Sequence, residues 1–206
     1  MIIAVDGPAA AGKGTIARAL AQHFGYHFLD TGTLYRRVGL ALLQSSVSPG
    51  DHKAAVAIAR NLNSLPYSDL ELRTEAVGAA ASVVAVIPEV RQALLAYQRS
   101  FASQQPGAVL DGRDIGTVVC PDADVKLFIT ASPEIRAKRR LAELQAYGAD
   151  VTFEAVLQEI RQRDERDRTR AVAPLVPASD AATIDTSDMN IEAATVAAIK
   201  AASSVG

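Results

Sequence analysis

The sequence predicts a three-layer α/β/α fold around a five-stranded parallel sheet, and three observations support this prediction. Short apolar segments alternate with helical stretches along the chain. The first of these segments leads directly into a glycine-rich run that is followed by an amphipathic stretch. With 206 residues, the chain can bury a sizeable core as one domain with an insertion.

The five predicted strands are short, apolar and separated by helical stretches. Strands that alternate with helices form a parallel sheet that is covered on both faces. The strands are predicted at Ile2–Asp6, His27–Asp30, Ala108–Asp111, Val125–Thr130 and Ala182–Asp185.

The run that follows the first strand, GPAAAGKGT from Gly7 to Thr15, is typical of a loop that holds nucleotide phosphates. Glycines let backbone N–H groups point inward, and the amphipathic stretch Ile16–Phe24 predicts a helix whose positive end faces the same point. Lys13 adds a charge for the β- and γ-phosphates, and a hydroxyl two residues later can bind Mg²⁺. The generic motif has Ser or Thr directly after the lysine, whereas Gly14 stands there in this chain. A plain glycine-containing turn is the alternative.

The second and third predicted strands are separated by about 75 residues with little strand pattern. This stretch is rich in Ala, Leu and Val and is interrupted by Pro49, Gly50, Pro66 and Pro88. Connections in α/β folds are normally much shorter, so we expect an inserted helical subdomain. We place the core of a single domain at about 1–36 and 106–206, and the insert at about 37–105.

Composition excludes several classes of function. A formal net charge of −2 and three scattered histidines argue against a nucleic-acid-binding surface and a histidine-rich metal site. The single cysteine, Cys120, excludes an internal disulfide and is expected to be a small buried apolar residue. Neither a basic leader nor an apolar run of about 18 residues is visible, so we expect a cytoplasmic protein without a membrane segment. The absence of a heptad pattern favours a monomer.

The third predicted strand ends in AVLDGRDIG, which places Asp111, Arg113 and Asp114 just past its carboxyl end. In open α/β sheets, ligands bind in the crevice at that edge. A surface salt bridge is the alternative. Because a buried strand delivers these residues, we favour a role in the site.

The segment Phe153–Arg170 is predicted to be a helix whose inward side changes from apolar to ionic. Phe153, Val156, Leu157 and Ile160 form an apolar stripe at helical spacing. The same face continues as Arg163, Asp164, Asp167 and Arg170. Charges on an inward face need partners, which phosphates or a ribose would supply. A solvated helix end is the alternative.

Arg136 and Arg140 are four residues apart on a predicted helix that follows the fourth strand. This helix leads to the flexible sequence YGAD at residues 147–150. A turn flanked by helices that carry arginines is typical of a lid that closes over a phosphate donor, and we expect this lid at about 141–153.

Together, these residues make the chain resemble the bacterial cytidylate kinases and, more broadly, the nucleoside monophosphate kinases among the P-loop kinases. The resemblance covers nearly the whole chain and includes LDTGTLYR at 29–36, DGRDIGTVV at 111–119 and RDERDRTRAVAPLVP at 163–177. It implies transfer of the γ-phosphoryl group of Mg·ATP to CMP or dCMP. In this family the phosphate loop ends in GKGT, so Gly14 agrees with the resemblance.

The resemblance also implies roles for individual residues. The ATP-binding loop would comprise Gly7, Pro8, Ala9, Ala10, Ala11, Gly12, Lys13, Gly14 and Thr15. CMP would be bound by Thr31, Arg36, Ser82, Arg91, Arg113, Asp114, Arg163, Asp167 and Arg170. Charge on the transferred group would be offset by Lys13, Arg136, Arg140 and Arg163. Independently of the resemblance, we expect Mg²⁺ as the cofactor, with Thr15 as a ligand and Asp111 as a candidate for orienting a metal-bound water.

Cytosine selection has a chemical basis in this assignment. The Asp114 carboxylate can accept a hydrogen bond from the cytosine amino group, and Arg91 can donate to N3 or O2. Uracil presents an oxygen where cytosine has the amino group, so Asp114 would face a second acceptor. Leaving such groups unpaired is worth a few kcal/mol of discrimination.

Other functions stay open at this point. The main rival is a kinase of the same fold that acts on UMP, AMP or a small metabolite, and a second is a nucleotide-binding regulatory switch. An N-K-x-D-type base-reading motif, which a guanine-nucleotide switch would need, does not occur. A catalytically silent relative is disfavoured by Lys13, Thr15 and the arginines. One departure from the family is that LNSLPYSDLELR at 62–73 is shorter than its usual counterpart.

Overall fold

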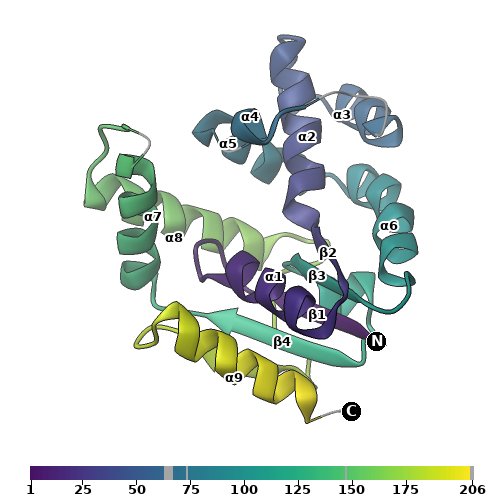
Figure 1. The fold of residues 1–206 in the computed structure, drawn as a ribbon. Coiled ribbons are helices and arrows are strands. Elements are labelled where there is room, and N and C mark those ends of the chain that lie inside the picture. Colours follow the sequence, from purple (N-terminus) through teal and green to yellow (C-terminus); the bar gives the residue numbers. More distant parts are fainter. Residues whose placement is uncertain (63–66, 73, 147, 205–206) are drawn as a thin grey trace. The chain divides into compact units, whose positions relative to one another are not determined.

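The computed structural model describes residues 1–62, 67–72, 74–146 and 148–204. Its sheet has the strand order β2-β3-β1-β4-β5, and the first four strands along the chain are labelled in Figure 1. β1 pairs in parallel with β3 and β4, and β4 pairs in parallel with β5. The strands are β1 (Ile2–Asp6), β2 (His27–Asp30), β3 (Ala108–Gly112), β4 (Val125–Thr130) and β5 (Ala182–Asp185). The five predicted strands are thus confirmed, and β3 ends one residue later than predicted.

Most helices lie between the strands, and one follows the last strand. They are α1 (Lys13–Phe24), α2 (Thr31–Gln44), α3 (His52–Arg60), α4 (Asp69–Leu72), α5 (Glu75–Val84), α6 (Pro88–Ala102), α7 (Pro133–Ala146), α8 (Phe153–Thr169) and α9 (Ile191–Ser203). A short π-helix, η2 (Ile115–Val119), follows β3 and was not anticipated from the sequence. The predicted first helix begins three residues earlier than expected, at Lys13.

Several helices begin at a polar side chain that accepts a hydrogen bond from the backbone N–H three residues later. These caps are Asp51 on α3, Thr74 on α5, Thr152 on α8 and Asn190 on α9. At α1, by contrast, Gly12 takes the cap position and provides no side-chain hydrogen bond. The first N–H groups of α1 are therefore left for another acceptor.

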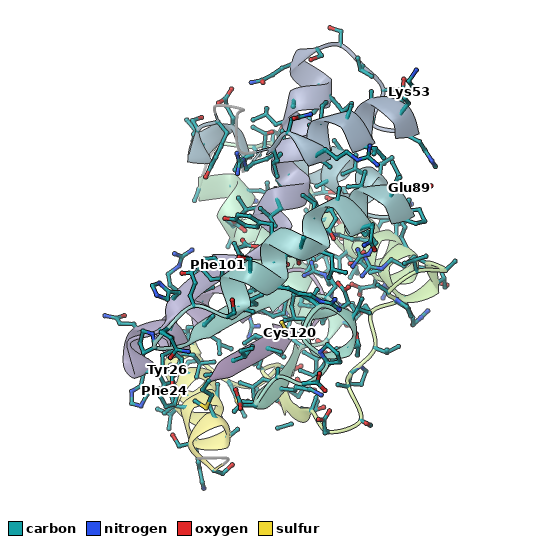
Figure 2. All side chains as sticks on the ribbon, turned by 90° about the vertical axis from the view of Figure 1, so that its right-hand side faces the viewer. Phe24, Tyr26, Lys53, Glu89, Phe101 and Cys120 are labelled. Carbon is teal, nitrogen blue, oxygen red and sulfur yellow. The ribbon has the colours of Figure 1, made fainter. Side chains whose placement is uncertain are left out.

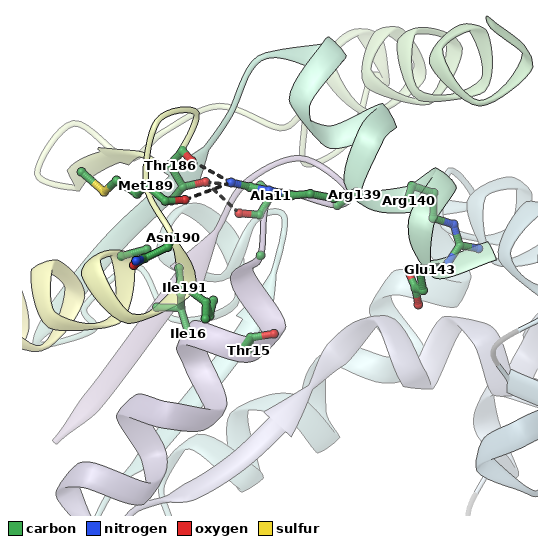
Figure 3. Close-up of a pocket in the computed structure, with 13 residues that line it drawn as sticks. Ala11, Thr15, Ile16, Arg139, Arg140, Glu143, Thr186, Met189, Asn190 and Ile191 are labelled. Carbon is green, nitrogen blue, oxygen red and sulfur yellow. Dashed lines mark hydrogen bonds and ion pairs between the residues drawn. The ribbon is translucent and has the colours of Figure 1, made fainter. Parts of the chain in front are cut away.

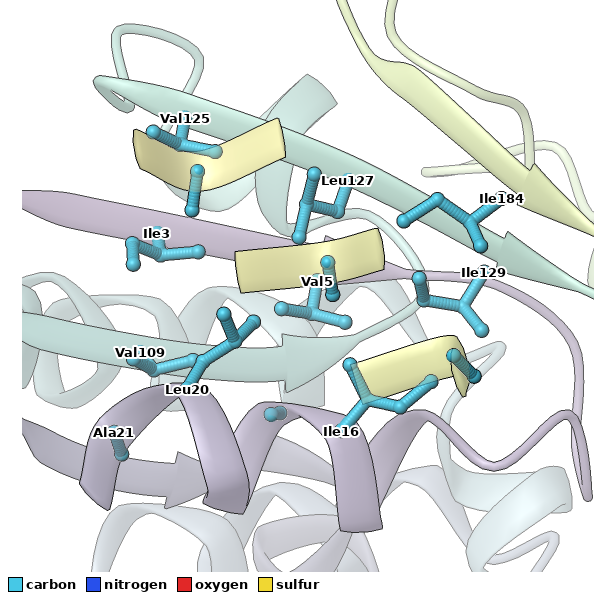
Figure 4. Close-up of a cluster of buried hydrophobic side chains, with 14 of the residues drawn as sticks. Ile3, Val5, Ile16, Leu20, Ala21, Val109, Val125, Leu127, Ile129 and Ile184 are labelled. Carbon is cyan, nitrogen blue, oxygen red and sulfur yellow. The ribbon is translucent and has the colours of Figure 1, made fainter. Parts of the chain in front are cut away.

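The main hydrophobic core anchors α1 against the sheet. β1 lies in the middle of the sheet, and its residues Ile3 and Val5 are fully buried on the same face. Ile16 and Leu20 of α1 pack in the same cluster (Figure 4), which also contains three alanines of α9. Both ends of the glycine-rich loop are thus attached to buried structure.

The C-terminal end of α1 is closed by a glycine in the left-handed conformation. Gly25 has φ of 67°, and the N–H of Tyr26 donates to the carbonyl of Ala21 at 2.8 Å. The rings of Phe24 and Tyr26, labelled in Figure 2, stack with their centroids 5.6 Å apart. This turn directs the chain into β2.

The chain divides into two compact units, Met1–Leu29 with Ala102–Gly206, and Asp30–Phe101. The second unit has a core of its own, formed mainly by α2, α3, α5 and α6. Gly39 allows α2 to approach α5 closely, because a Cβ atom there would lie 2.9 Å from that of Ala80. Most of the expected insert, 37–105, falls within this unit.

Two expectations fall partly outside the described residues. In the shortened stretch Leu62–Arg73, positions 63–66 and 73 are outside, and the described part includes the short helix α4. In the expected lid, Tyr147 is outside, and Gly148 follows with a φ of 79°.

Cys120, labelled in Figure 2, is buried, as the sequence predicts. Within the described part of the chain, no single helix combines the length and hydropathy needed to cross a membrane. Taken together, α5 and α6 are long and apolar enough by length and composition alone, and the pair is bent by 100° at the break between the two helices.

Candidate active site

The loop between β1 and α1 requires glycine at Gly7 and takes left-handed backbone values at two further positions. Gly7 has φ of 147°, and a Cβ atom there would lie 1.9 Å from the carbonyl oxygen of Ile129. Ala10 and Gly12 also have positive φ values, of 59° and 88°. With no side chain capping α1 at Gly12, the loop presents backbone N–H groups and the positive end of the helix to an anion. This is the geometry predicted for a phosphate-binding loop.

Lys13 is held across this loop and is only 6% exposed. Its Nζ donates to the carbonyl of Pro8 at 3.2 Å and lies 3.6 Å from Oδ1 of Asp111. Asp111 reaches this place because β3 pairs with β1, with Asp111 opposite Val5. The structure therefore brings the predicted lysine and the predicted carboxylate together.

Gly14 leaves room for the same carboxylate. A Cβ atom at Gly14 would lie 3.3 Å from Oδ2 of Asp111, which is closer than ordinary van der Waals contact. The glycine after Lys13 thus has a steric reason in this structure. Asp111 can approach the first turn of α1 because position 14 has no side chain.

A pocket of about 460 Å³ opens beside the loop (Figure 3). It is lined by the loop and α1, by α7 and by the segment from Thr186 to Ala194 that begins α9. Arg139 crosses it and donates to Oγ1 of Thr186 at 3.0 Å and to its carbonyl at 2.7 Å. The Thr186 hydroxyl donates to the carbonyl of Ala11 at 3.2 Å. These bonds connect α7 and the β5–α9 loop to the glycine-rich loop.

Arg139 and Thr186 were missed by the sequence analysis. Arg139 belongs to the basic run RAKRR at 136–140, from which only its first and last arginines were selected. Thr186 directly follows β5, at the carboxyl edge where ligands bind in such sheets. That position was the signal that could have identified it.

The ionic end of α8 is directed inward, as predicted. Arg113 Nε donates to Oδ2 of Asp167 at 3.1 Å, and Arg170 Nη2 lies 3.7 Å from Oδ1 of Asp114. Arg170 is not part of the helix, which ends at Thr169, but its side chain is only 4% exposed. The DGRD loop and α8 therefore form one charged cluster.

Asp167 is ionised within this cluster. Burial acts to raise the pKa of its carboxyl group, but Arg113, Arg163 and Arg170 together lower that pKa below its ordinary value. These three arginines all act on Asp167. Guanidinium groups gathered in this way suit a phosphate-bearing ligand.

Arg136 and Arg140 differ in their surroundings. Arg136 is 3% exposed, and its two Nη atoms donate to Asp164 at 2.9 and 2.5 Å. It also donates to the carbonyl of Ala9, so it joins α7 and α8 to the glycine-rich loop. Arg140 lines the pocket and pairs with Glu143 at 2.9 Å.

The second unit buries polar side chains among its helices. Thr31, Ser82 and Arg91, which lie on α2, α5 and α6, are all buried. Arg91 donates to the carbonyl of Ala85 at 3.2 Å, and its guanidinium lies 5.5 Å from the ring centroid of Tyr35. Arg36 donates to the carbonyl of Leu72 at 2.7 Å. Thr31, Ser82 and Arg91 are thus buried in this unit, and Arg36 is oriented by a hydrogen bond within it.

Comparison with known proteins decides the family, because the family model described as cytidylate kinase matches residues 3–204. The chain belongs to the cytidylate kinase family. A protein named cytidylate kinase from Rhodospirillum rubrum is 56% identical over 203 residues, which are 97% of this chain and 95% of that protein. One from Bradyrhizobium diazoefficiens is 54% identical over 199 residues, covering 97% of this chain and 94% of that protein. The resemblance drawn from the sequence motifs is confirmed.

Solved structures agree with the fold. A crystal structure of an uncharacterized protein from Eubacterium ventriosum aligns with a TM-score of 0.59 at 15% identity and covers 99% of both chains. One from Thermus thermophilus has a TM-score of 0.52 at 21% identity and covers 99% of this chain and 96% of that one. At these identities the likeness concerns the fold alone.

Membership of a kinase family favours the phosphotransferase over the regulatory switch. It also agrees with the division of charged residues within the first unit. One group, around Lys13 and the pocket, presents backbone N–H groups and a lysine. The other, around Asp114 and Asp167, presents paired carboxylates and guanidinium groups.

Proposed function

We propose that this protein transfers the γ-phosphoryl group of ATP to CMP or dCMP, giving ADP and CDP or dCDP. The observation that carries this proposal is the ionic cluster of Asp114, Arg170, Arg113 and Asp167, which accompanies the phosphate loop in one unit. A nucleotide switch binds one nucleotide and needs no groups for a second phosphate-bearing ligand. A kinase needs a second set of groups that recognises a phosphate-bearing acceptor.

The donor is bound by the glycine-rich loop and the neighbouring pocket in this proposal. The loop N–H groups and Lys13 hold the phosphates, as the loop residues Gly7 to Thr15 would in any P-loop kinase. The pocket beside Thr15 receives the base and ribose, because it is continuous with the loop and is largely lined by small and apolar residues. Arg139 keeps its walls in place through Thr186.

Mg²⁺ fits the residues present. Among the described residues there is no group of three or more His, Cys, Asp or Glu side chains that could hold a metal ion by themselves. Mg²⁺ usually keeps several waters and binds through one or two protein oxygens together with substrate phosphates. Thr15 at the end of the loop and Asp111 beside Lys13 are such oxygen donors. When bound, the ion would neutralise charge on the phosphate oxygens.

The residues that the family resemblance assigns to CMP recognise the acceptor in this proposal. Asp114, Arg91 and Ser82 select cytosine, and Thr31, Arg36 and Arg113 bind the phosphate. Asp167 and Arg170 lie around the ribose, and Arg163 meets the phosphates. The ion pairs Arg113–Asp167 and Arg170–Asp114 orient the two carboxylates.

Catalysis then depends on positioning and charge, because phosphoryl transfer asks little covalent chemistry of the protein. Lys13, Arg140 and Arg163 would stabilise charge that builds on the transferred group and its oxygens. The acceptor phosphate is already an anion, so no general base is needed. Arg136, whose guanidinium is engaged by Asp164 and Ala9, would act by positioning the loop.

The arrangement of domains is part of the proposal. The insert, about 37–105, would bind the acceptor, and residues 141–153 would form the lid. The protein would act as a monomer in the cytoplasm, with no nucleic-acid or membrane partner.

The test is a coupled measurement of ADP formation with ATP, Mg²⁺ and each nucleoside monophosphate in turn. We expect CMP and dCMP to be the best acceptors. Equal activity on AMP, or no activity with CMP, would overturn the proposal. A preference for UMP over CMP would favour the rival kinase.

A further inference from the structure

Asp6 links the first strand to the segment that follows the DGRD loop. It is the last residue of β1, directly before Gly7, and it is only 5% exposed. Oδ1 accepts a hydrogen bond from the N–H of Ile115, and Oδ2 accepts one from the N–H of Gly116, both at 2.8 Å. Both carboxylate oxygens are therefore bonded to the start of η2, 109 and 110 residues away in the chain.

The segment that Asp6 contacts is of an uncommon kind. The N–H groups of Val119 and Cys120 donate to the carbonyls of Asp114 and Ile115, which gives the wide turn of a π-helix. π-helical turns are rare and often occur at functional sites, and the first N–H groups of a helix have no partner within it. Asp6, at the end of β1, provides an acceptor for two of these N–H groups.

This arrangement changes the part that Asp114 can play. Asp114 stands at the N-cap position of η2, where an aspartate usually bonds to the N–H groups of its own helix. Its side chain makes no such bond here and lies 3.7 Å from Nη2 of Arg170. Asp6 takes the N–H groups of Ile115 and Gly116, the second of which a capping aspartate could otherwise use, and the Asp114 carboxylate is turned away from its own helix.

We propose that Asp6 is a positioning residue for acceptor selection, because it caps η2 and thereby directs the Asp114 side chain toward Arg170 and the acceptor base. This inference rests on the proposed function and adds to it a residue outside the motifs that contact the substrates. Burial raises the pKa of Asp6 to about 6, although its two backbone hydrogen bonds act to lower that pKa. The carboxylates of Asp114 and Asp111 add to the rise. The carboxylate is thus charged near neutral pH, and both oxygens can accept.

The test uses Asp6→Asn in the full-length protein. The amide keeps the size of the side chain but turns one acceptor into a donor, which faces a backbone N–H. We expect the ratio of kcat/KM for CMP to that for UMP to fall about 10-fold, with KM for ATP changed less than about 2-fold. Asp124→Asn is the matched control, since Asp124 also accepts from a backbone N–H of β1, that of Ile2. The control should leave the ratio unchanged.

A double variant separates positioning from general damage. If Asp6 acts through Asp114, Asp6→Asn should lower the CMP preference of the wild type but not that of Asp114→Ala. An equal rise in KM for ATP and CMP in Asp6→Asn, or an unchanged preference, would overturn the inference. If the wild type itself shows no preference for CMP, the proposed function fails instead.

Discussion

Replacing Gly14 by alanine tests whether position 14 must be glycine so that Asp111 can approach the first turn of α1. The added Cβ atom would lie 3.3 Å from Oδ2 of Asp111, so the carboxylate or the helix must move by a few tenths of an ångström. Asp111 is also 3.6 Å from Nζ of Lys13, and any displacement changes the position of that charge. The substitution should therefore change kcat more than it changes the free energy of unfolding.

The substitution has two effects on the free energy of unfolding, a gain in helix propensity and a strain at Asp111, and they have opposite signs. Alanine is favoured over glycine within a helix by about 1 kcal/mol. A strained side chain at Asp111 costs about 0.5–1.5 kcal/mol. We expect the free energy of unfolding to change by less than about 1 kcal/mol, which for a chain of this size shifts Tm by no more than about 4 °C. In contrast, kcat should fall about 3- to 10-fold, since a displacement of 1 Å at reacting groups can cost about 100-fold.

The assay is steady-state kinetics with ATP and CMP, together with thermal unfolding of the same samples. The control is the pair Asp111→Ala and Gly14→Ala/Asp111→Ala, because without the carboxylate the added methyl group has nothing to displace. These two variants should have the same kcat. Unchanged kcat in Gly14→Ala, or a further loss in the double variant, would refute the steric account of Gly14.

Four further predictions concern other parts of the molecule. Thr186→Val removes the hydroxyl that bonds to Arg139 and to Ala11. KM for ATP should rise about 5- to 10-fold with KM for CMP unchanged, and equal changes in both would contradict the donor pocket. Asp114→Ala should abolish the preference for CMP over UMP while ATP binding, measured by calorimetry, is retained; an unchanged preference would mean that the base pocket is elsewhere. Leu20→Ala should lower the free energy of urea unfolding by about 2–5 kcal/mol, because this side chain is fully buried under the sheet, and a loss below about 1 kcal/mol would speak against that packing. The pKa of Asp6 rises from 3.8 to about 6 on folding, so its contribution to stability is present below pH 3.8 and is lost as the pH increases through 6. Relative to Asp6→Asn, the wild type should lose about 2 kcal/mol of unfolding free energy between pH 4 and pH 7, and parallel stability profiles would refute the shift.

Local patterns in the sequence were sufficient for the strands, the phosphate loop and the orientation of α8. A strand or a helix is recognised by the spacing of its apolar residues, and this spacing repeats within a few positions. The ionic continuation of the α8 stripe could be predicted for the same reason. Arg170 was an exception in detail, since its side chain is buried although the helix ends before it.

The contacts of the arginines on α7 could not be predicted. Arg136 and Arg140 are equivalent in a helical projection, yet Arg136 is engaged by Asp164 and by the carbonyl of Ala9, while Arg140 pairs with Glu143 beside the pocket. Asp164 is 28 residues away in the chain and Ala9 is 127. Which arginine meets them depends on how α7 packs against α8 and the loop.

The sequence by itself determined the class of this protein: a parallel sheet, a glycine-rich loop before the first helix, and the motifs of the cytidylate kinase family. These features depend on residues that are close in the chain, and short-range spacing specifies them. Only the tertiary structure decided how the site is supported. Asp6 caps η2 across 109 residues, and Thr186 bonds to Ala11 across 175. Such bonds form because parallel strands bring their carboxyl ends to one edge of the sheet, where groups from distant parts of the chain come within hydrogen-bonding distance.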